Sequence, residues 1–474
     1  MATAKKNQKS LSRPRGTGHG QLTLVEHALC PLDPDASLHQ NLIHATEYHY
    51  TDSSRHQQTA NARVFSPLGL SAHDELFLWG LLSVTLSQPD VETELHATPH
   101  YFLRQLGMID QHARRGGRQY QQFTDSLARL AAVVYQNDRF YDPIRCEHRR
   151  VSFGFLSYSL PLEAESCRAW RIMWNPMFFE LVNAGAGHFR FDLGTYRSLE
   201  PASRRLFLLL SKIFQRRPVS PRFDLLHLAV NVLGFSPTIS ASDLKKKVRR
   251  CVERLAELGV VAGSASADIF EKERAGQYRV TLQRGQYFDS KAVFTPLGIA
   301  DSALGESLAA IGLEPAVIHR FSKQYPTHVL REWADITLAA RERFGVKYFK
   351  RSAAAYFVDN VQHARDGGRT APDWWHELKK AERMQQAEND RRRRQIAAEP
   401  PVESTLSKES RQLFVQVTNE LFQQFQSAGQ SPETARMNAQ RFAAEHIKRM
   451  SRPGESDPRA LNALRLVLPS DQSS

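Results

Sequence analysis

The chain has 474 residues, more than one hydrophobic core usually supports, so the sequence predicts two or three domains. It carries 63 Lys and Arg against 50 Asp and Glu, a net charge of +13 that favours a polyanionic partner such as nucleic acid. The sequence has no apolar run of membrane-spanning length, and its four cysteines are widely separated, which excludes an integral membrane protein and a disulfide framework.

The first 65 residues are polar and show little periodicity, which predicts a flexible arm over 1–65. Four histidines in this stretch invite a metal-site or nuclease interpretation, but the His-hydrophobe-His strand with a nearby tyrosine that a nuclease needs is missing. We therefore expect no metal and no cofactor. The histidines are His39, His44, His49 and His56.

A first winged-helix domain is predicted over 66–176. Ser71–Asp74 has the pattern of a capped helix start, and Thr98–Leu106 and Arg118–Val134 have apolar residues at helical spacing. Extended segments rich in aromatic and β-branched residues follow, and the basic connection Arg145–Arg150 is the expected wing tip. The extended segments are Val133–Tyr141, Val151–Tyr158 and Ala169–Trp174.

The same order of elements recurs over 177–290, which predicts a second winged-helix domain. A helix opens at Leu199–Ala202, and a short helix, Phe223–Leu233, ends at Gly234. A basic helix and then a hairpin of two alternating strands, Ala267–Lys272 and Gln277–Leu282, complete the unit. Such a duplicated order is stronger evidence for DNA binding than one basic helix, which on its own is more often a solvated surface.

The basic helix, residues 241–258, is the feature around which the chain is organised. It has an apolar stripe on one face and cationic side chains on the other, with Ser242 placed as N-cap and Gly259 placed as the glycine that follows a helix end. Because the cations gather in its first half, the pattern is typical of a recognition helix that enters a major groove. The stripe consists of Leu244, Val248, Cys251, Val252, Leu255 and Leu258.

After the second unit the sequence predicts a linker over 291–310, a helical region over 311–376 and a charged, partly disordered tail over 377–474. The run Arg391–Arg394 is either solvated or an extra nucleic-acid contact. The amphipathic segment Ser410–Met450 is expected to form one or two helices used in partner contacts. The fold class is thus α+β, mainly α, with two tandem winged helix-turn-helix domains, a helical C-terminal region and flexible termini.

The stretch from Ser71 to about Gln286 resembles the plasmid replication initiators, most closely the replication initiator protein A family. The resemblance is diffuse and lies in the Thr98–Met108 helix, in Gly116–Leu130, in Leu199–Leu206 and in the basic stretch Leu244–Leu255. It implies binding to repeated double-stranded sites (iterons) at a plasmid origin, opening of adjacent A·T-rich DNA and recruitment of a host helicase or initiator. It also implies that dimers and monomers act differently. The first winged-helix domain then either contacts DNA or holds a homodimer together.

No phosphate-binding loop, zinc motif or nucleophile motif occurs in the sequence, so we expect a protein without enzymatic activity, cytoplasmic and without a membrane partner. A winged-helix transcriptional repressor, and a structural protein whose basic faces are merely solvated, stay open as alternatives. The candidate DNA-binding residues of the second unit are Ser242, Lys245, Lys246, Lys247, Arg249, Arg250, Arg254, Lys272, Arg274 and Arg279. Those of the first unit are Arg114, Arg115, Arg118, Gln119, Gln122, Ser126, Arg129, Arg149 and Arg150.

Overall fold

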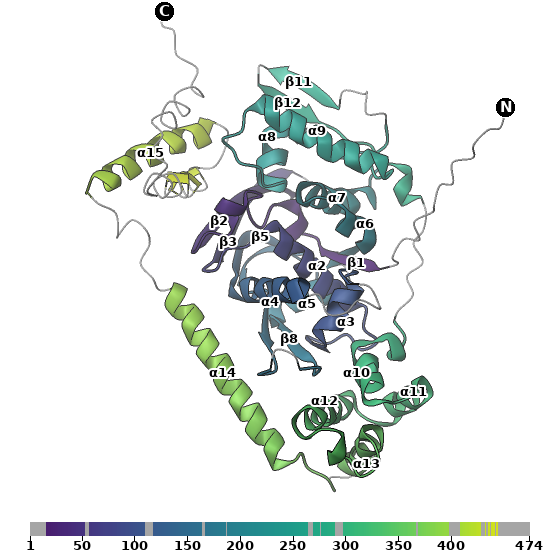
Figure 1. The fold of residues 1–474 in the computed structure, drawn as a ribbon. Coiled ribbons are helices and arrows are strands. Elements are labelled where there is room, and N and C mark those ends of the chain that lie inside the picture. Colours follow the sequence, from purple (N-terminus) through teal and green to yellow (C-terminus); the bar gives the residue numbers. More distant parts are fainter. Residues whose placement is uncertain are drawn as a thin grey trace, which may run out of the picture. The chain divides into compact units, whose positions relative to one another are not determined.

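Figure 1 shows the fold in a computed structural model. The structure describes residues 16–52, 56–109, 117–163, 166–185, 187–263, 269–274, 276–289, 297–365, 368–397 and 408–427, with single residues between 432 and 443. The chain forms two compact bodies, an N-terminal body (Met1–Ala397) and a C-terminal body (Ala398–Ser474), and each is described by itself.

The N-terminal region is folded in its described part, so the prediction of a flexible arm over 1–65 is wrong there. Its strands join two antiparallel sheets, one of order β1-β9 and one of order β2-β3-β5-β6. In β3 every second side chain is buried (Ala60, Ala62 and Val64), and these small residues form a buried face in a stretch whose composition is otherwise polar. The elements are β1 (Thr17–Gln21), η1 (Leu24–Glu26), α1 (Pro34–Ser37), β2 (Leu42–Thr51), β3 (Gln57–Ser66), β5 (Val134–Asp142), β6 (Glu147–Phe153) and β9 (His188–Asp192).

Repeat A, residues 72–174, has three helices and a three-stranded sheet of order β4-β8-β7. The predicted helix start is confirmed, since Ser71 and Asp74 form a reciprocal capping box. Strands β5 and β6 are inserted between the third helix and β7 and belong to the sheet of the N-terminal strands. The elements of repeat A are α2 (Ala72–Leu86), β4 (Glu94–Ala97), α3 (Pro99–Gln105), α4 (Gly117–Ala132), β7 (Leu156–Ser159) and β8 (Trp170–Trp174).

Repeat B, residues 201–280, has the same order of elements, and its sheet order β10-β12-β11 corresponds strand by strand to that of repeat A. The short helix predicted over Phe223–Leu233 is divided into a two-residue strand, a helical turn and a π-helical turn, and Gly234 ends it at a φ of 82°. The elements of repeat B are α7 (Pro201–Phe214), β10 (Phe223–Asp224), α8 (Leu225–His227), η2 (Leu228–Val232), α9 (Ala241–Glu257), β11 (Phe270–Arg274) and β12 (Gln277–Val280).

The two repeats and the N-terminal strands share one hydrophobic core, so the segments predicted as separate domains, 66–176 and 177–290, are packed together. A buried ion pair joins them: the Arg205 guanidinium of α7 donates to both oxygens of Glu75 in α2 at 2.6 and 3.0 Å. Burial of both partners makes this pair costly to break from one side. Helices α5 (Pro176–Asn183) and α6 (Leu193–Ser198) connect the repeats, and η3 (Gln286–Phe288) follows repeat B.

A helical module, residues 303–397, has a second core that includes Leu308, Trp333 and Trp375. The prediction of a linker over 291–310 is wrong in its described part, because Ser302 caps a helix whose apolar residues are buried. The last helix of the module begins at Asp373, so the predicted boundary between the helical region (311–376) and the tail (377–474) falls inside one helix. The elements are η4 (Ile299–Asp301), α10 (Ala303–Ile311), α11 (Pro315–Gln324), α12 (Thr327–Phe344), η5 (Val346–Tyr348), α13 (Ala353–Arg365) and α14 (Asp373–Ala397).

The C-terminal body contains α15 (Lys408–Ser427), which begins the amphipathic segment that the sequence predicted over Ser410–Met450. Its buried side chains recur at helical spacing and pack against alanines farther along the chain. A role in partner contacts stays a prediction. The buried side chains of α15 are Phe414, Val417, Leu421 and Phe425, and the alanines are Ala435, Ala439 and Ala443.

Candidate nucleic-acid interface

The basic helix α9 begins at Ala241, two residues earlier than the proposed cap at Ser242 allows. Ser240, not Ser242, is the N-cap: its hydroxyl accepts from the Asp243 N–H at 3.2 Å and donates to the Asp243 carboxylate at 2.8 Å. Ser242 lies exposed in the first turn. The predicted apolar stripe is confirmed, with Leu258 partly buried beside the other five members, and Gly259 has a φ of 73° directly after the helix.

One row of cations on α9 faces solvent. Lys246, Arg250 and Arg254 lie four residues apart, which places them along one face of the helix, and all three are exposed. Lys246 donates to Asp243 at 3.0 Å and holds the pKa of that carboxyl below its usual value, with a further contribution from Ser240. We call these three residues the outward row.

A second pair of cations on α9 faces the hairpin of repeat B. The Lys245 ammonium lies 4.9 Å from the ring centre of Phe270 and 4.7 Å from that of Tyr278, and the Arg249 guanidinium lies 5.4 Å from Phe270. At these distances the ring faces attract the cations. We call Lys245 and Arg249 the hairpin-side pair, because they connect α9 to the β11–β12 hairpin, hereafter hairpin B.

The remaining candidate cations of repeat B lie around α9. Lys247 is half-buried, 5.5 Å from the ring centre of Phe235. On hairpin B, Lys272 and Arg274 are exposed, whereas Arg279 forms an ion pair with Glu273 at 3.0 Å. Helix α9 alone has six basic and three acidic side chains, so its surface attracts polyanions. Phe270 and Phe235 were not predicted as residues of this site. The aromatic residues in the sequence of the hairpin could have indicated Phe270.

Helix α4 holds the corresponding place in repeat A, and two of its candidate residues point into the protein. Ser126 is fully buried and donates to Asp74 Oδ1 at 2.5 Å, while Arg129 forms two hydrogen bonds of 2.8 Å with the Asp74 carboxylate. Both side chains are engaged with a buried carboxylate of α2, Arg129 as its cation and Ser126 as a hydrogen-bond donor, which argues against their predicted presentation to DNA. Arg118 is exposed and Gln119 and Gln122 are half-buried.

The other candidates of the first unit lie away from α4 or outside the described residues. Arg149 and Arg150 are exposed on β6, and Arg149 lies 3.5 Å from both Asp142 and Glu147. The wing tip expected at Arg145–Arg150 is thus a turn and strand of the four-stranded sheet. The hairpin of repeat A that corresponds to hairpin B is β7–β8, hereafter hairpin A. Arg114 and Arg115 lie outside the described residues.

The part of the chain that the structure describes contains no group of three or more His, Cys, Asp or Glu side chains arranged to hold a metal ion. All four cysteines are unpaired. None of its helices is long and apolar enough to cross a bilayer.

Comparison with known proteins gives structural neighbours only. No protein-family model matches the chain, and no curated protein matches it. A crystal structure of domains 2 and 3 of RctB is similar to it with 16% identity and a TM-score of 0.36, over 55% of this chain and 96% of that one. Another crystal structure of RctB domains 2 and 3 has 13% identity and a TM-score of 0.33, over 51% of this chain and 91% of that one.

Proposed function

We propose that the chain binds double-stranded DNA through repeat B, whose elements form a winged helix-turn-helix with α9 as recognition helix and hairpin B as wing. The observation that carries this proposal is the outward row of Lys246, Arg250 and Arg254 on a helix that the rest of the repeat buries only on its other face. Such a row fits a major groove, where Arg reads guanine and Lys contacts phosphates.

The two sets of cations on α9 have different roles in this proposal. Arg250 and Lys246 enter the groove, and Arg254 contacts the backbone farther along the helix. Lys245 and Arg249 lie over the rings of Phe270 and Tyr278, so they fix the angle between helix and wing and add positive charge beside the groove. The exposed Lys272 and Arg274 then lie against the phosphates.

We further propose that the DNA is a set of repeated sites at a replication origin, as the resemblance to plasmid initiators implies. Since the sequence has no phosphate-binding loop, origin opening draws its free energy from binding and bending DNA and not from nucleotide hydrolysis. Recruitment of a host helicase or initiator, and dimerisation through repeat A, belong to the same proposal.

A binding titration tests the DNA-binding role. Arg250→Ala is expected to weaken binding to a selected duplex by about 1–3 kcal/mol and to relax specificity at one base pair. Lys246→Ala is expected to lower the slope of log affinity against log salt by about one. The matched control is Arg351→Ala, an exposed arginine of the helical module that should leave both quantities unchanged. Equal affinity of Arg250→Ala and wild type at every salt concentration refutes the placement of α9.

A plasmid rescue separates the initiator from a repressor. The gene with its flanking DNA is placed on a plasmid whose own origin cannot work in the host, and an initiator sustains that plasmid. The Arg250→Ala gene should fail in this assay. Wild-type DNA binding without rescue, combined with repression of a reporter, favours the transcriptional repressor.

A further inference from the structure

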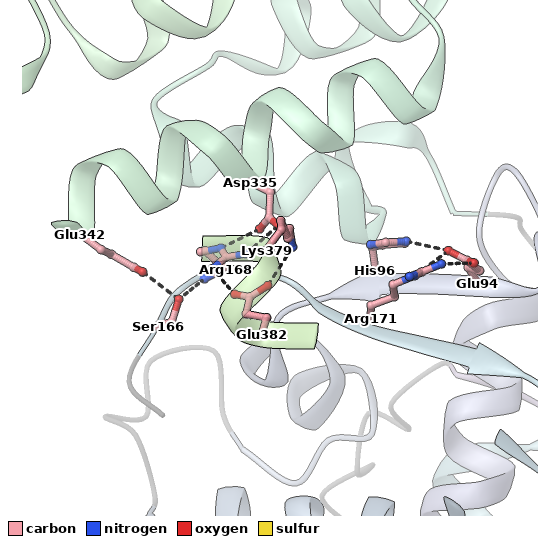
Figure 2. A network of polar contacts seen from close by, with 9 residues as sticks. All are labelled: Glu94, His96, Ser166, Arg168, Arg171, Asp335, Glu342, Lys379 and Glu382. Atoms are coloured by element: carbon pink, nitrogen blue, oxygen red, sulfur yellow. Dashed lines mark hydrogen bonds and ion pairs between the residues drawn. The ribbon is translucent and has the colours of Figure 1, made fainter. Parts of the chain in front are cut away.

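The loop of hairpin A contains an arginine that is buried by the helical module. Arg168 is 3% exposed, although arginine is almost never fully buried unless it is paired. It donates to Asp335 of α12 at 3.2 and 3.3 Å and to Glu382 of α14 at 2.6 Å, and its guanidinium lies 4.8 Å from the ring centre of Trp375. Figure 2 shows Arg168 between the two carboxylates.

The neighbouring residues of the same loop are held by a third acid of the module. Glu342 of α12 accepts from the Ser166 hydroxyl at 2.8 Å and from the Cys167 N–H at 2.6 Å. Ser166 is itself buried. The loop is therefore attached through main chain and side chains to two helices that follow it by more than 150 residues (Figure 2).

Hairpin B has the opposite surroundings. Glu271, Lys272, Glu273 and Arg274 on its first strand are all exposed, and the hairpin contacts α9 through Lys245 and Arg249. The loop of hairpin A is instead held by the carboxylates of Asp335, Glu342 and Glu382, which repel phosphate groups at short range. A DNA duplex cannot contact Arg168 while these carboxylates are bound to it.

We propose that the helical module competes with DNA for hairpin A, so that repeat A is closed and repeat B alone binds until the module is released. This inference rests on the proposed DNA-binding function. Release breaks the contacts of Arg168 with Asp335 and Glu382 and makes that guanidinium available to a phosphate. The two acids keep a partner in the released state, because Lys379 lies 3.4 Å from Asp335 and 3.1 Å from Glu382.

The test uses the full chain and two variants of the contact. Asp335→Asn/Glu382→Gln removes both negative charges and leaves Arg168 intact, whereas Arg168→Ala removes the contact and the cation together. Glu94→Gln is the matched control, since Glu94 pairs with Arg171 on the neighbouring strand of the same sheet and not with the module. The probe is a duplex of roughly 40 base pairs selected by the wild-type protein from a random library, about four helical turns.

Two readouts are combined: hydrogen exchange of the hairpin A loop and of α14, and the length of the DNA footprint. For Asp335→Asn/Glu382→Gln we expect faster exchange at both places and a footprint longer by about one helical turn, 10 base pairs. Arg168→Ala should show the faster exchange with a smaller gain in footprint length, and Glu94→Gln should match wild type in both readouts.

Either of two results overturns the proposal. Unchanged exchange in Asp335→Asn/Glu382→Gln means that the contact does not hold the module, and faster exchange with a wild-type footprint means that the module does not compete with DNA. Failure of the underlying function is a different result: wild type then gives no footprint, or gives one that Arg250→Ala does not alter.

Discussion

Repeats A and B have the same order of helices and strands, yet the surfaces of their third helices differ. Helix α9 of repeat B has six basic and three acidic side chains, with its outward row exposed to solvent. Helix α4 of repeat A has two basic side chains and one acidic, and one of the two, Arg129, is turned inward to Asp74. Two units of the same topology therefore need not both bind DNA, because DNA binding depends on the side chains that each unit exposes.

The buried carboxylate of Asp74 explains why α4 and α9 have different surfaces. In repeat A the third helical position of α2, Asp74, is fully buried and needs a cation, which α4 supplies. In repeat B the corresponding first helix, α7, has no acidic residue in its first turn, so no carboxylate there takes a cation from α9. Helix α4 thus uses Arg129 to neutralise a buried carboxylate, whereas α9 keeps Arg250 and Arg254 exposed.

The largest expected effect comes from neutralising the outward row. In Lys246→Gln/Arg250→Gln/Arg254→Gln we expect binding to weaken on the order of 3–9 kcal/mol, because up to three DNA contacts of about 1–3 kcal/mol each are lost. The measurement is a fluorescence-anisotropy titration on a selected duplex. The matching change in repeat A, Arg118→Gln/Gln122→Ala, should alter affinity by less than tenfold. Equal losses in the two repeats contradict the unequal roles assigned to them.

The second effect concerns stability instead of binding. Arg129→Ala leaves the Asp74 carboxylate buried without its cation, and we expect the free energy of unfolding to fall by about 3–5 kcal/mol. Urea denaturation measures this loss. DNA affinity of the folded fraction should stay at the wild-type value, the reverse of the result expected for Arg250→Ala. A weakened affinity without a loss of stability contradicts the structural role of Arg129.

The sequence predicted the parts of the fold that depend on local patterns. Helical spacing, the Ser71 cap and Gly259 located the helices, and the duplicated order was visible because each copy repeats the same local signals. It did not predict what depends on distant partners: that Ala60, Ala62 and Val64 form a buried strand face, or that hairpin A is β7–β8. Exposure of Arg250 and burial of Arg129 are likewise decided by tertiary neighbours, since both are arginines on amphipathic helices.

A third prediction concerns the second helix of repeat B, which contacts strand β2. His227 in α8 stacks on His49 at 4.2 Å, and burial, followed by the nearby His49, lowers its pKa to about 3. The unfolded chain binds a proton at this histidine near pH 6.5 and the folded chain does not, so stability falls as the pH drops below 6.5, by roughly 1.4 kcal/mol per pH unit.

Comparison of wild type with His227→Gln isolates this contribution. Between pH 6.5 and 5 the variant should lose roughly 2 kcal/mol less than wild type, measured by urea denaturation at each pH. His19 and His27, whose pKa values burial lowers to about 3 and about 4, are present in both proteins and cancel in the difference. Parallel pH profiles of the two proteins contradict a buried, neutral His227.

The smallest effect separates the hairpin-side pair from the outward row. Phe270→Leu keeps an apolar side chain in the core but removes the ring that faces Lys245 and Arg249, and cation–π contacts of this kind contribute about 0.5–2 kcal/mol. We expect DNA affinity to fall about fivefold while the salt slope stays constant, because no phosphate contact is lost but the wing is held less firmly. Tyr278→Phe keeps its ring and should bind like wild type. A changed salt slope in Phe270→Leu places Lys245 and Arg249 on the phosphates, since only cations that touch DNA displace counterions when they bind.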